Sequence, residues 1–227
     1  MKILALDTST EACSAAVVID GAVYERFELV QQQHSARILP MVQEVLAEAE
    51  LALSHLDVLA FSRGPGSFTA LRIGAGVVQG LAFGADLPVT PVSSLAALAQ
   101  GRQAERILAA FDARMLQVYW GAYVRNSVGI MELQGREIVV APQEAPLPDG
   151  EGWLGAGGGW DRHGEKLLAR LGFYLGSPPW QPHCYPRARH VAQLGVVAFN
   201  RGEAVAAENA APVYLRDEVA KKPKAKA

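Results

Sequence analysis

The sequence has 227 residues, of which 50% are hydrophobic, and its formal net charge is −2. This length suits one large domain or two small ones, and the near-neutral charge excludes a global basic field that would hold nucleic acid. Two cysteines, Cys13 and Cys184, are too few for a disulfide framework. Because no apolar run approaches about 18 residues and the chain opens on a strand pattern, we expect no membrane span, no signal peptide and a cytoplasmic location.

The first half of the sequence predicts secondary structure in the order β-β-β-α-β-α. Apolar runs predict strands over 2–7, 13–20 and 22–29, with Asp20 and Gly21 as a hairpin turn between the last two. Apolar residues at helical spacing predict a helix over 35–51, which either begins near Pro40 or is kinked there. A strand over 56–62, a helix that contains four glycines, a strand over 87–92 and a short helix over 94–100 complete this half.

The second half repeats this order more faintly. An apolar strand that ends in aspartate recurs over 106–112 and parallels 2–7. Strands over 116–124 and 130–141, with Gly135 as a turn, precede a loop over 142–152, a strand over 153–156 and a helix over 160–171. Proline-rich irregular chain over 178–186 leads into a helix over 188–200. We therefore predict an α/β fold with duplicated lobes over 1–104 and 105–220, followed by a disordered basic tail over 221–227.

The glycine-containing helix and the turn before it are the most unusual stretch. Gly64, Pro65 and Gly66 predict a tight turn, and the Ser67 hydroxyl is placed to cap the helix that follows. A glycine turn before a helix is either purely structural or a phosphate contact. Each glycine inside the helix costs about 0.5–1 kcal/mol against alanine, so another interaction must compensate.

Three of these glycines, at positions 76, 80 and 84, lie four residues apart and form a smooth stripe. Such a stripe allows the close approach of another helix. The alternative is that the glycines face the chain's own sheet.

Two aspartates at strand ends are candidates for nucleotide binding. Asp7, Thr8, Ser9 and Thr10 have the composition of a turn that holds a phosphate and its magnesium, and Asp112 occupies the equivalent place in the second half. An ordinary side-chain-capped turn is the alternative. The run 155–159 either receives an adenosine or turns a corner.

The remaining polar motifs point to no catalytic site. His34 and Ser35 suit a helix cap better than a hydrolase, because the sequence has no Gly-x-Ser-x-Gly elbow. His183, Cys184 and His190 match no standard zinc spacing. We expect no metal.

Four blocks of this sequence together resemble the bacterial TsaB (YeaZ) family: 3–10, 62–74, 111–115 and 212–216. The resemblance covers nearly the whole chain and implies the actin/Hsp70/sugar-kinase fold, in agreement with the duplicated pattern. It also implies a role in making N6-threonylcarbamoyladenosine at position 37 of tRNAs that read ANN codons. In that pathway TsaD is the catalyst, TsaB is its required partner and the ATPase TsaE joins them.

The resemblance also indicates which role to expect. The catalytic relative carries a metal-binding histidine pair after the strand that follows its glycine helix, whereas 92–99 here contains neither histidine nor carboxylate. Ser9 replaces the glycine of the superfamily's Asp-x-Gly-Thr turn. We therefore expect a non-catalytic scaffold without a cofactor. A nucleotide-binding enzyme is the alternative, and a peptidase is a weaker one.

In the family, the first two helices pack against the same helices of TsaD, or of a second copy when TsaD is absent. This implies a contact surface made of Ile38, Val42, Val45, Ala49, Ile73, Gly76, Val77, Gly80 and Gly84. A homodimer through it would be isologous and would compete with TsaD. Transfer RNA would bind only within the complex. The lysines of the tail either touch its phosphates or are merely solvated.

Overall fold

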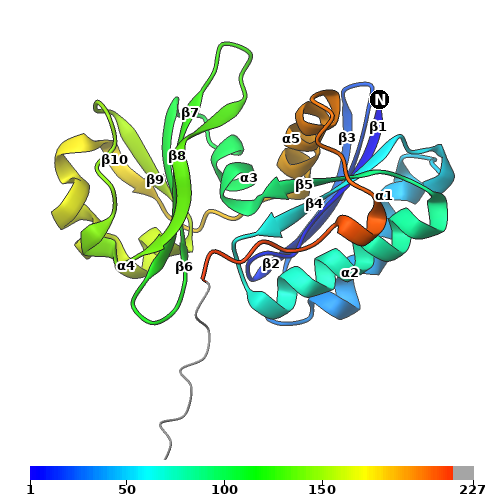
Figure 1. The fold of residues 1–227 in the computed structure, drawn as a ribbon, viewed down its shortest axis with the longest axis horizontal. Coiled ribbons are helices and arrows are strands. Elements are labelled where there is room, and N and C mark those ends of the chain that lie inside the picture. The colour runs from blue at the N-terminus through cyan, green and yellow to red at the C-terminus, as the bar shows by residue number, and fades with distance from the viewer. Residues whose placement is uncertain (217–227) are drawn as a thin grey trace, which may run out of the picture.

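The computed structural model describes residues 1–216, so the predicted tail over 221–227 lies outside the described part. The chain forms two α/β lobes side by side (Figure 1), each built on a five-stranded mixed sheet.

The first sheet contains β1 (Lys2–Asp7), β2 (Ala12–Ile19), β3 (Ala22–Leu29), β4 (Val58–Gly64) and β5 (Val89–Ser93). Its order is β3-β2-β1-β4-β5, in which β1 pairs antiparallel with β2 and parallel with β4. The helices of this half are α1 (His34–Glu48), α2 (Phe68–Ala85) and α3 (Ser94–Gln100).

The second sheet contains β6 (Arg106–Asp112), β7 (Val118–Arg125), β8 (Met131–Val140), β9 (Trp153–Ala156) and β10 (Leu175–Gln181). Its order, β8-β7-β6-β9-β10, reproduces the first sheet strand by strand. Its helices are α4 (Gly158–Leu171) and α5 (Ala188–Asn200). The predicted duplication is therefore confirmed. The two halves differ between β8 and β9, where a short 3-10 turn (Pro142–Glu144) stands in place of a counterpart of α1.

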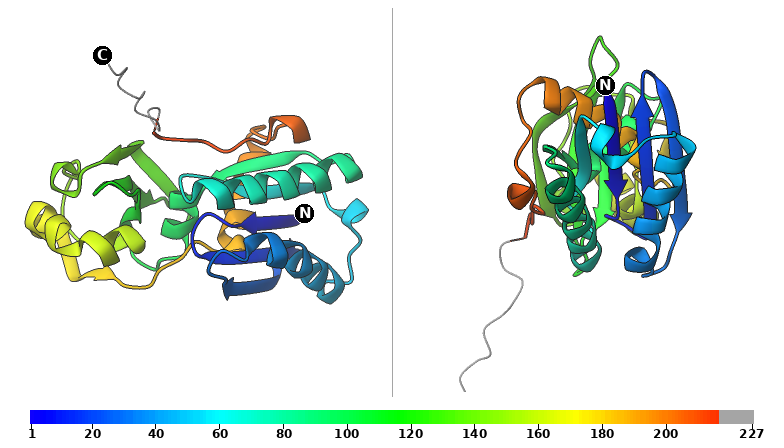
Figure 2. Two further views of the ribbon diagram at one scale, coloured as in Figure 1. Left: turned by 90° about the horizontal axis from the view of Figure 1, so that it is seen from below. Right: turned by 90° about the vertical axis from the view of Figure 1, so that its right-hand side faces the viewer.

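Helices cover both faces of each sheet. Two of them, α3 and α5, each pack on the sheet formed by the other half of the sequence. Helices α1 and α2 pack on one face of the first sheet, and α5, from the second half of the sequence, packs on the other (Figures 1 and 2). Helix α3 packs on the second sheet, opposite α4. A boundary at residue 104 therefore separates the sheets but assigns both α3 and α5 to the wrong lobe. Helix α5, for example, buries Ala188, Val191 and Ala192 against the first sheet.

Several local predictions need correction. The segment around Pro178 and Pro179 is the edge strand β10, where a proline without an N–H is tolerated, rather than irregular chain. Gly135 lies inside β8 with φ +79°, next to a register shift against β7, so it forms a bulge and not a turn. Helix α1 begins at His34 and runs through Pro40.

Helix α2 is longer and more apolar than the sequence analysis expected of any segment. Its 18 residues have a mean hydropathy of 1.3, so by length and composition alone it could cross a membrane, contrary to our expectation that no run reaches this length. Its inward face, with Leu71, Ala75 and Val78, packs on the first sheet. Only a third of the helix is buried, which leaves much apolar surface facing outward.

Candidate functional site

The turn after β1 is largely buried in the first lobe. Asp7, Thr8 and Ser9 are buried, and Asp7 accepts hydrogen bonds from the Ser9 N–H and the Ser9 hydroxyl, both at 3.2 Å, and from the Ser62 hydroxyl. Burial raises the pKa of the Asp7 carboxyl from 3.8 to about 6, although these hydrogen bonds lower it. Thr10 is half-buried. The oxygens expected to face a nucleotide are thus occupied within the protein.

The glycine turn before α2 is what closes this site. The Ser67 N–H donates to the Ser9 carbonyl at 2.8 Å, and the Thr8 hydroxyl donates to the Ala70 carbonyl at 2.7 Å. A Cβ on Gly66 would overlap the Ser9 carbonyl oxygen, so this position requires glycine. The two motifs that the sequence analysis treated separately therefore form one packed unit. This packing supports the structural interpretation of the turn rather than the phosphate contact.

The other three residues of the predicted turn and cap are Gly64, Pro65 and Ser67. Gly64 has φ +113°, a conformation that glycine tolerates, and Pro65 is buried. Ser67 occupies the N-cap position of α2 as predicted, but within residues 1–216 its side chain makes no capping hydrogen bond. The hydroxyl cap was therefore a wrong prediction, and the Ser67 backbone rather than its side chain fixes the helix start.

Asp112, at the end of β6, is surrounded by basic groups. Its Oδ1 lies 3.3 Å from His163 Nε2, and its Oδ2 lies 3.4 Å from Arg162 Nη1 and 3.5 Å from Arg114 Nη1. The Arg114 N–H also donates to Oδ1 at 3.2 Å. Its carboxylate charge is thus compensated within the chain.

The run 155–159 is tightly packed rather than open. A Cβ on Gly157 would overlap the Ala110 carbonyl oxygen of β6, and one on Gly159 would lie 2.8 Å from Ala110. A Cβ on Gly155 would overlap the Trp160 ring. This segment turns a corner against β6. Within residues 1–216 there is no group of three or more His, Cys, Asp or Glu side chains that could hold a metal ion.

The predicted contact surface divides into an inward part and an outward part. Ile38, Val42 and Val45 are at most 2% exposed and pack on the chain's own first sheet, so their assignment to a partner surface was wrong. Ala49 is half-buried against the same core. A helical repeat identifies residues that share a face, but it does not say what covers that face.

The outward part is the glycine stripe of α2. Gly76, Gly80 and Gly84 are exposed, and apart from the neighbouring backbone of α2 itself no atom lies within 4 Å of the Cβ that each would carry. Ile73 and Val77 are half-buried beside them. The glycines therefore face away from the first sheet, which excludes the alternative that they pack against it.

A shallow hollow of about 520 Å³ follows this stripe between α1 and α2. Besides residues of the stripe, Ser35, Leu39, Arg72 and Leu81 line it. Leu39 is 45% exposed, and Phe83, on the same helix as the stripe, is 83% exposed. The sequence analysis missed both residues. Each follows a buried residue of its helix directly in the sequence, and an extra apolar residue at such a position could have indicated an exposed apolar surface.

Comparison with known proteins identifies the chain. It is 42% identical to the tRNA threonylcarbamoyladenosine biosynthesis protein TsaB of Escherichia coli K12, over 97% of this chain and 96% of that protein. The TsaB of Haemophilus influenzae is also 42% identical, over 96% and 95% of the two chains. The chain belongs to the TsaB (YeaZ) family.

Structural comparison of this TsaB-family chain agrees. The structure of YeaZ from Pseudomonas aeruginosa superposes with a TM-score of 0.87 at 46% identity, covering 94% of this chain and 99% of that one. Residues 27–146 also match the family model of TsaD, the tRNA N6-adenosine threonylcarbamoyltransferase. The resemblance seen in the sequence and the predicted actin/Hsp70/sugar-kinase type of fold are confirmed.

Proposed function

We propose that this chain acts in the biosynthesis of N6-threonylcarbamoyladenosine in tRNA as a non-catalytic subunit that binds TsaD. The names of its TsaB relatives, at 42% identity over nearly the whole chain, support the pathway. The outward glycine stripe of α2 is the observation that carries the partner role. The three outward glycines together cost about 1.5–3 kcal/mol against alanine, and partner binding on their open side would compensate for part of this.

The proposed contact is a close helix–helix packing over Gly76, Gly80 and Gly84. Because these positions lack side chains and are open to solvent, a partner helix can approach α2 more closely than the usual 8–10 Å between helix axes. Ile73, Val77, Leu39 and Phe83 supply the apolar surface around the stripe. A homodimer through the same face would be isologous and would compete with TsaD.

The absence of catalysis is the second part of the proposal. Asp7 is buried, Asp112 is paired with Arg114, Arg162 and His163, and the segment after β5 is the apolar helix α3. These features favour a non-catalytic subunit. By the family resemblance, such a subunit would stabilise TsaD, help recruit TsaE and meet tRNA only within the cytoplasmic complex. The alternative, a nucleotide-dependent enzyme, predicts that the isolated chain binds and hydrolyses ATP, and calorimetry with ATP separates the two.

Size-exclusion chromatography with light scattering tests the contact. Gly80→Leu places a bulky side chain on the open stripe, and we expect it to abolish the complex with TsaD. Gly172→Leu is the matched control, since Gly172 also has helical angles and open space around its Cβ but lies on the second lobe. A folded Gly80→Leu variant that still forms the complex contradicts the proposed surface.

A further inference from the structure

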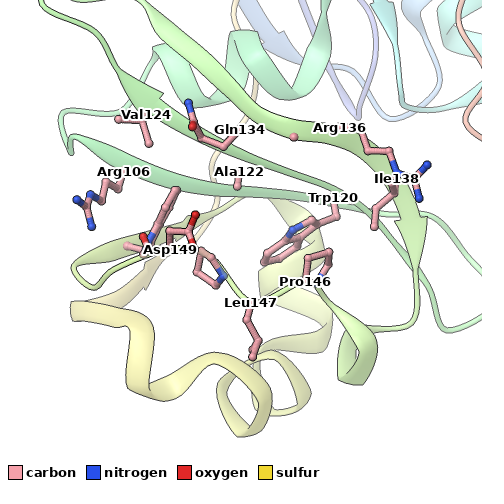
Figure 3. Close-up of a pocket in the computed structure, with 13 residues that line it drawn as sticks. Arg106, Trp120, Ala122, Val124, Gln134, Arg136, Ile138, Pro146, Leu147 and Asp149 are labelled. Atoms are coloured by element: carbon pink, nitrogen blue, oxygen red, sulfur yellow. The ribbon is translucent and has the colours of Figure 1, made fainter.

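The second lobe carries a hollow where its duplicated fold lacks a helix. In the first lobe, α1 covers the sheet with Ile38, Met41, Val42 and Val45. The second half has no counterpart of α1 between β8 and β9, and three tryptophans belong to the core on this face of its sheet: Trp120, Trp153 and Trp160. They do not cover this face completely. A hollow of about 610 Å³ remains between the second sheet and the loop 146–149 (Figure 3).

Most of the floor and of the opposite wall of this hollow is apolar, with Gln134 and Asp149 as polar exceptions. Trp120, Ala122, Val124 and Ile138 of the sheet form the floor. The loop 146–149 forms the opposite wall with two prolines and with Leu147, which is 47% exposed. A sheet face on one side and proline rings on the other leave a space suited to a flat apolar group. The volume lies within the range of about 300–1,000 Å³ that is common for small-molecule sites.

The ends of the hollow are positively charged. Figure 3 shows Arg106 and Arg136 on opposite sides of it. The Arg106 guanidinium donates to the Glu151 carbonyl at 2.9 Å and lies 5.9 Å from the centre of the Trp153 ring. In the described chain, neither arginine lies within 4.0 Å of a carboxylate oxygen.

The only acidic residue that lines the hollow is Asp149, against these two arginines, so its lining carries a net charge of +1. Guanidinium groups recognise carboxylate, sulfonate and phosphate oxygens with two parallel hydrogen bonds. We propose that the hollow binds a small amphipathic anion, with a flat apolar body between the sheet and the proline loop and one acidic group held by an arginine. This site lies on the second lobe, apart from α2, and does not depend on the proposed contact with TsaD.

The test is calorimetric titration of the full chain with 1-anilinonaphthalene-8-sulfonate, a flat anion, and with N-phenyl-1-naphthylamine, its uncharged analogue. We expect the sulfonate to bind more tightly than the amine. Arg106→Gln and Arg136→Gln should each weaken its binding about five- to tenfold, the effect of losing one charge-assisted contact at a partly exposed position. Ala122→Phe should abolish binding by filling the floor.

Two matched controls accompany these variants. Arg26→Gln removes an arginine that pairs with Glu44 and Glu48 of the first lobe, and Leu133→Phe enlarges a residue opposite Tyr123, on the other face of the second sheet. Both should bind the sulfonate like the wild type. Equal affinity of the two dyes, or unchanged sulfonate affinity in both arginine variants, overturns the proposal. Because the arginine side chains lie at the ends of the hollow, these variants decide the test even if Ala122→Phe does not fold.

Discussion

Gly80→Leu should affect the isolated fold and the proposed assembly in opposite directions. Gly80 lies inside α2, and apart from the neighbouring backbone of α2 itself no atom lies within 4 Å of an added Cβ. Glycine in a helix interior is about 0.8–1 kcal/mol less favourable than alanine, and leucine is close to alanine. We therefore expect this substitution to raise the free energy of unfolding of the monomer by about 0.5–1 kcal/mol.

The measurement is urea unfolding at a protein concentration where light scattering reports a monomer, because dimerisation would otherwise add to the apparent stability. Gly195→Leu is the contrasting variant. A Cβ on Gly195 would lie 2.8 Å from Ala60 and 2.9 Å from Thr90 Oγ1 of the first sheet, so leucine there should destabilise the fold by about 1–3 kcal/mol or more. If Gly80→Leu destabilises the monomer by more than about 1 kcal/mol, the stripe packs within the chain and our interpretation is wrong.

Three further substitutions test the packing described above. Gly66→Ala should lower the free energy of unfolding by about 1–3 kcal/mol, because its Cβ meets the Ser9 carbonyl; an unchanged urea midpoint would contradict this. The pKa of Asp7 is about 6 in the folded chain against an ordinary value of 3.8, because the buried carboxyl favours its protonated form. Its contribution to stability is therefore largest below pH 3.8 and is lost as the pH rises through 6. Asp7→Asn should remove that decline of roughly 3 kcal/mol, which urea titrations between pH 4 and 7 would detect. Trp160→Leu removes a buried ring and its 2.8 Å hydrogen bond to the Leu108 carbonyl. It should lower the free energy of unfolding by about 2–4 kcal/mol and the melting temperature by several degrees. A change below about 1 kcal/mol would show that the ring is not needed to fill the core of this lobe.

Local patterns in the sequence were sufficient to predict most of the helices and strands. The strand over Arg106–Asp112 and the helices over Ser94–Gln100 and Ala188–Asn200 have the predicted bounds, because apolar periodicity is a local signal. Ser93 also caps the start of the first of these helices. The proline-rich strand β10 was missed, since proline disfavours a strand except at an edge, and its edge position depends on pairing with β9.

Long-range packing accounts for the other errors. No local signal indicates that α5 crosses to the first sheet, because its apolar face would fit either sheet. For the same reason the buried face of α1, with Ile38 and Val42, was mistaken for a partner surface. Of the two alternatives for Gly76, Gly80 and Gly84, the structure has the outward-facing one, whereas the fourth glycine of α2, Gly74, packs against Thr8. The contact between the Asp7 turn and Gly66 joins positions distant in sequence, and only the structure reveals it.

Hydrogen–deuterium exchange of the full chain with and without TsaD tests the proposed contact most directly. We predict slower exchange in peptides from α2, over the positions of Gly76 and Gly80, and in the start of α1 around Leu39. Peptides from β7 and β8 should exchange unchanged. Slower exchange confined to the second lobe, with α2 unaffected by TsaD, would contradict the proposal that the outward face of α2 is the binding surface.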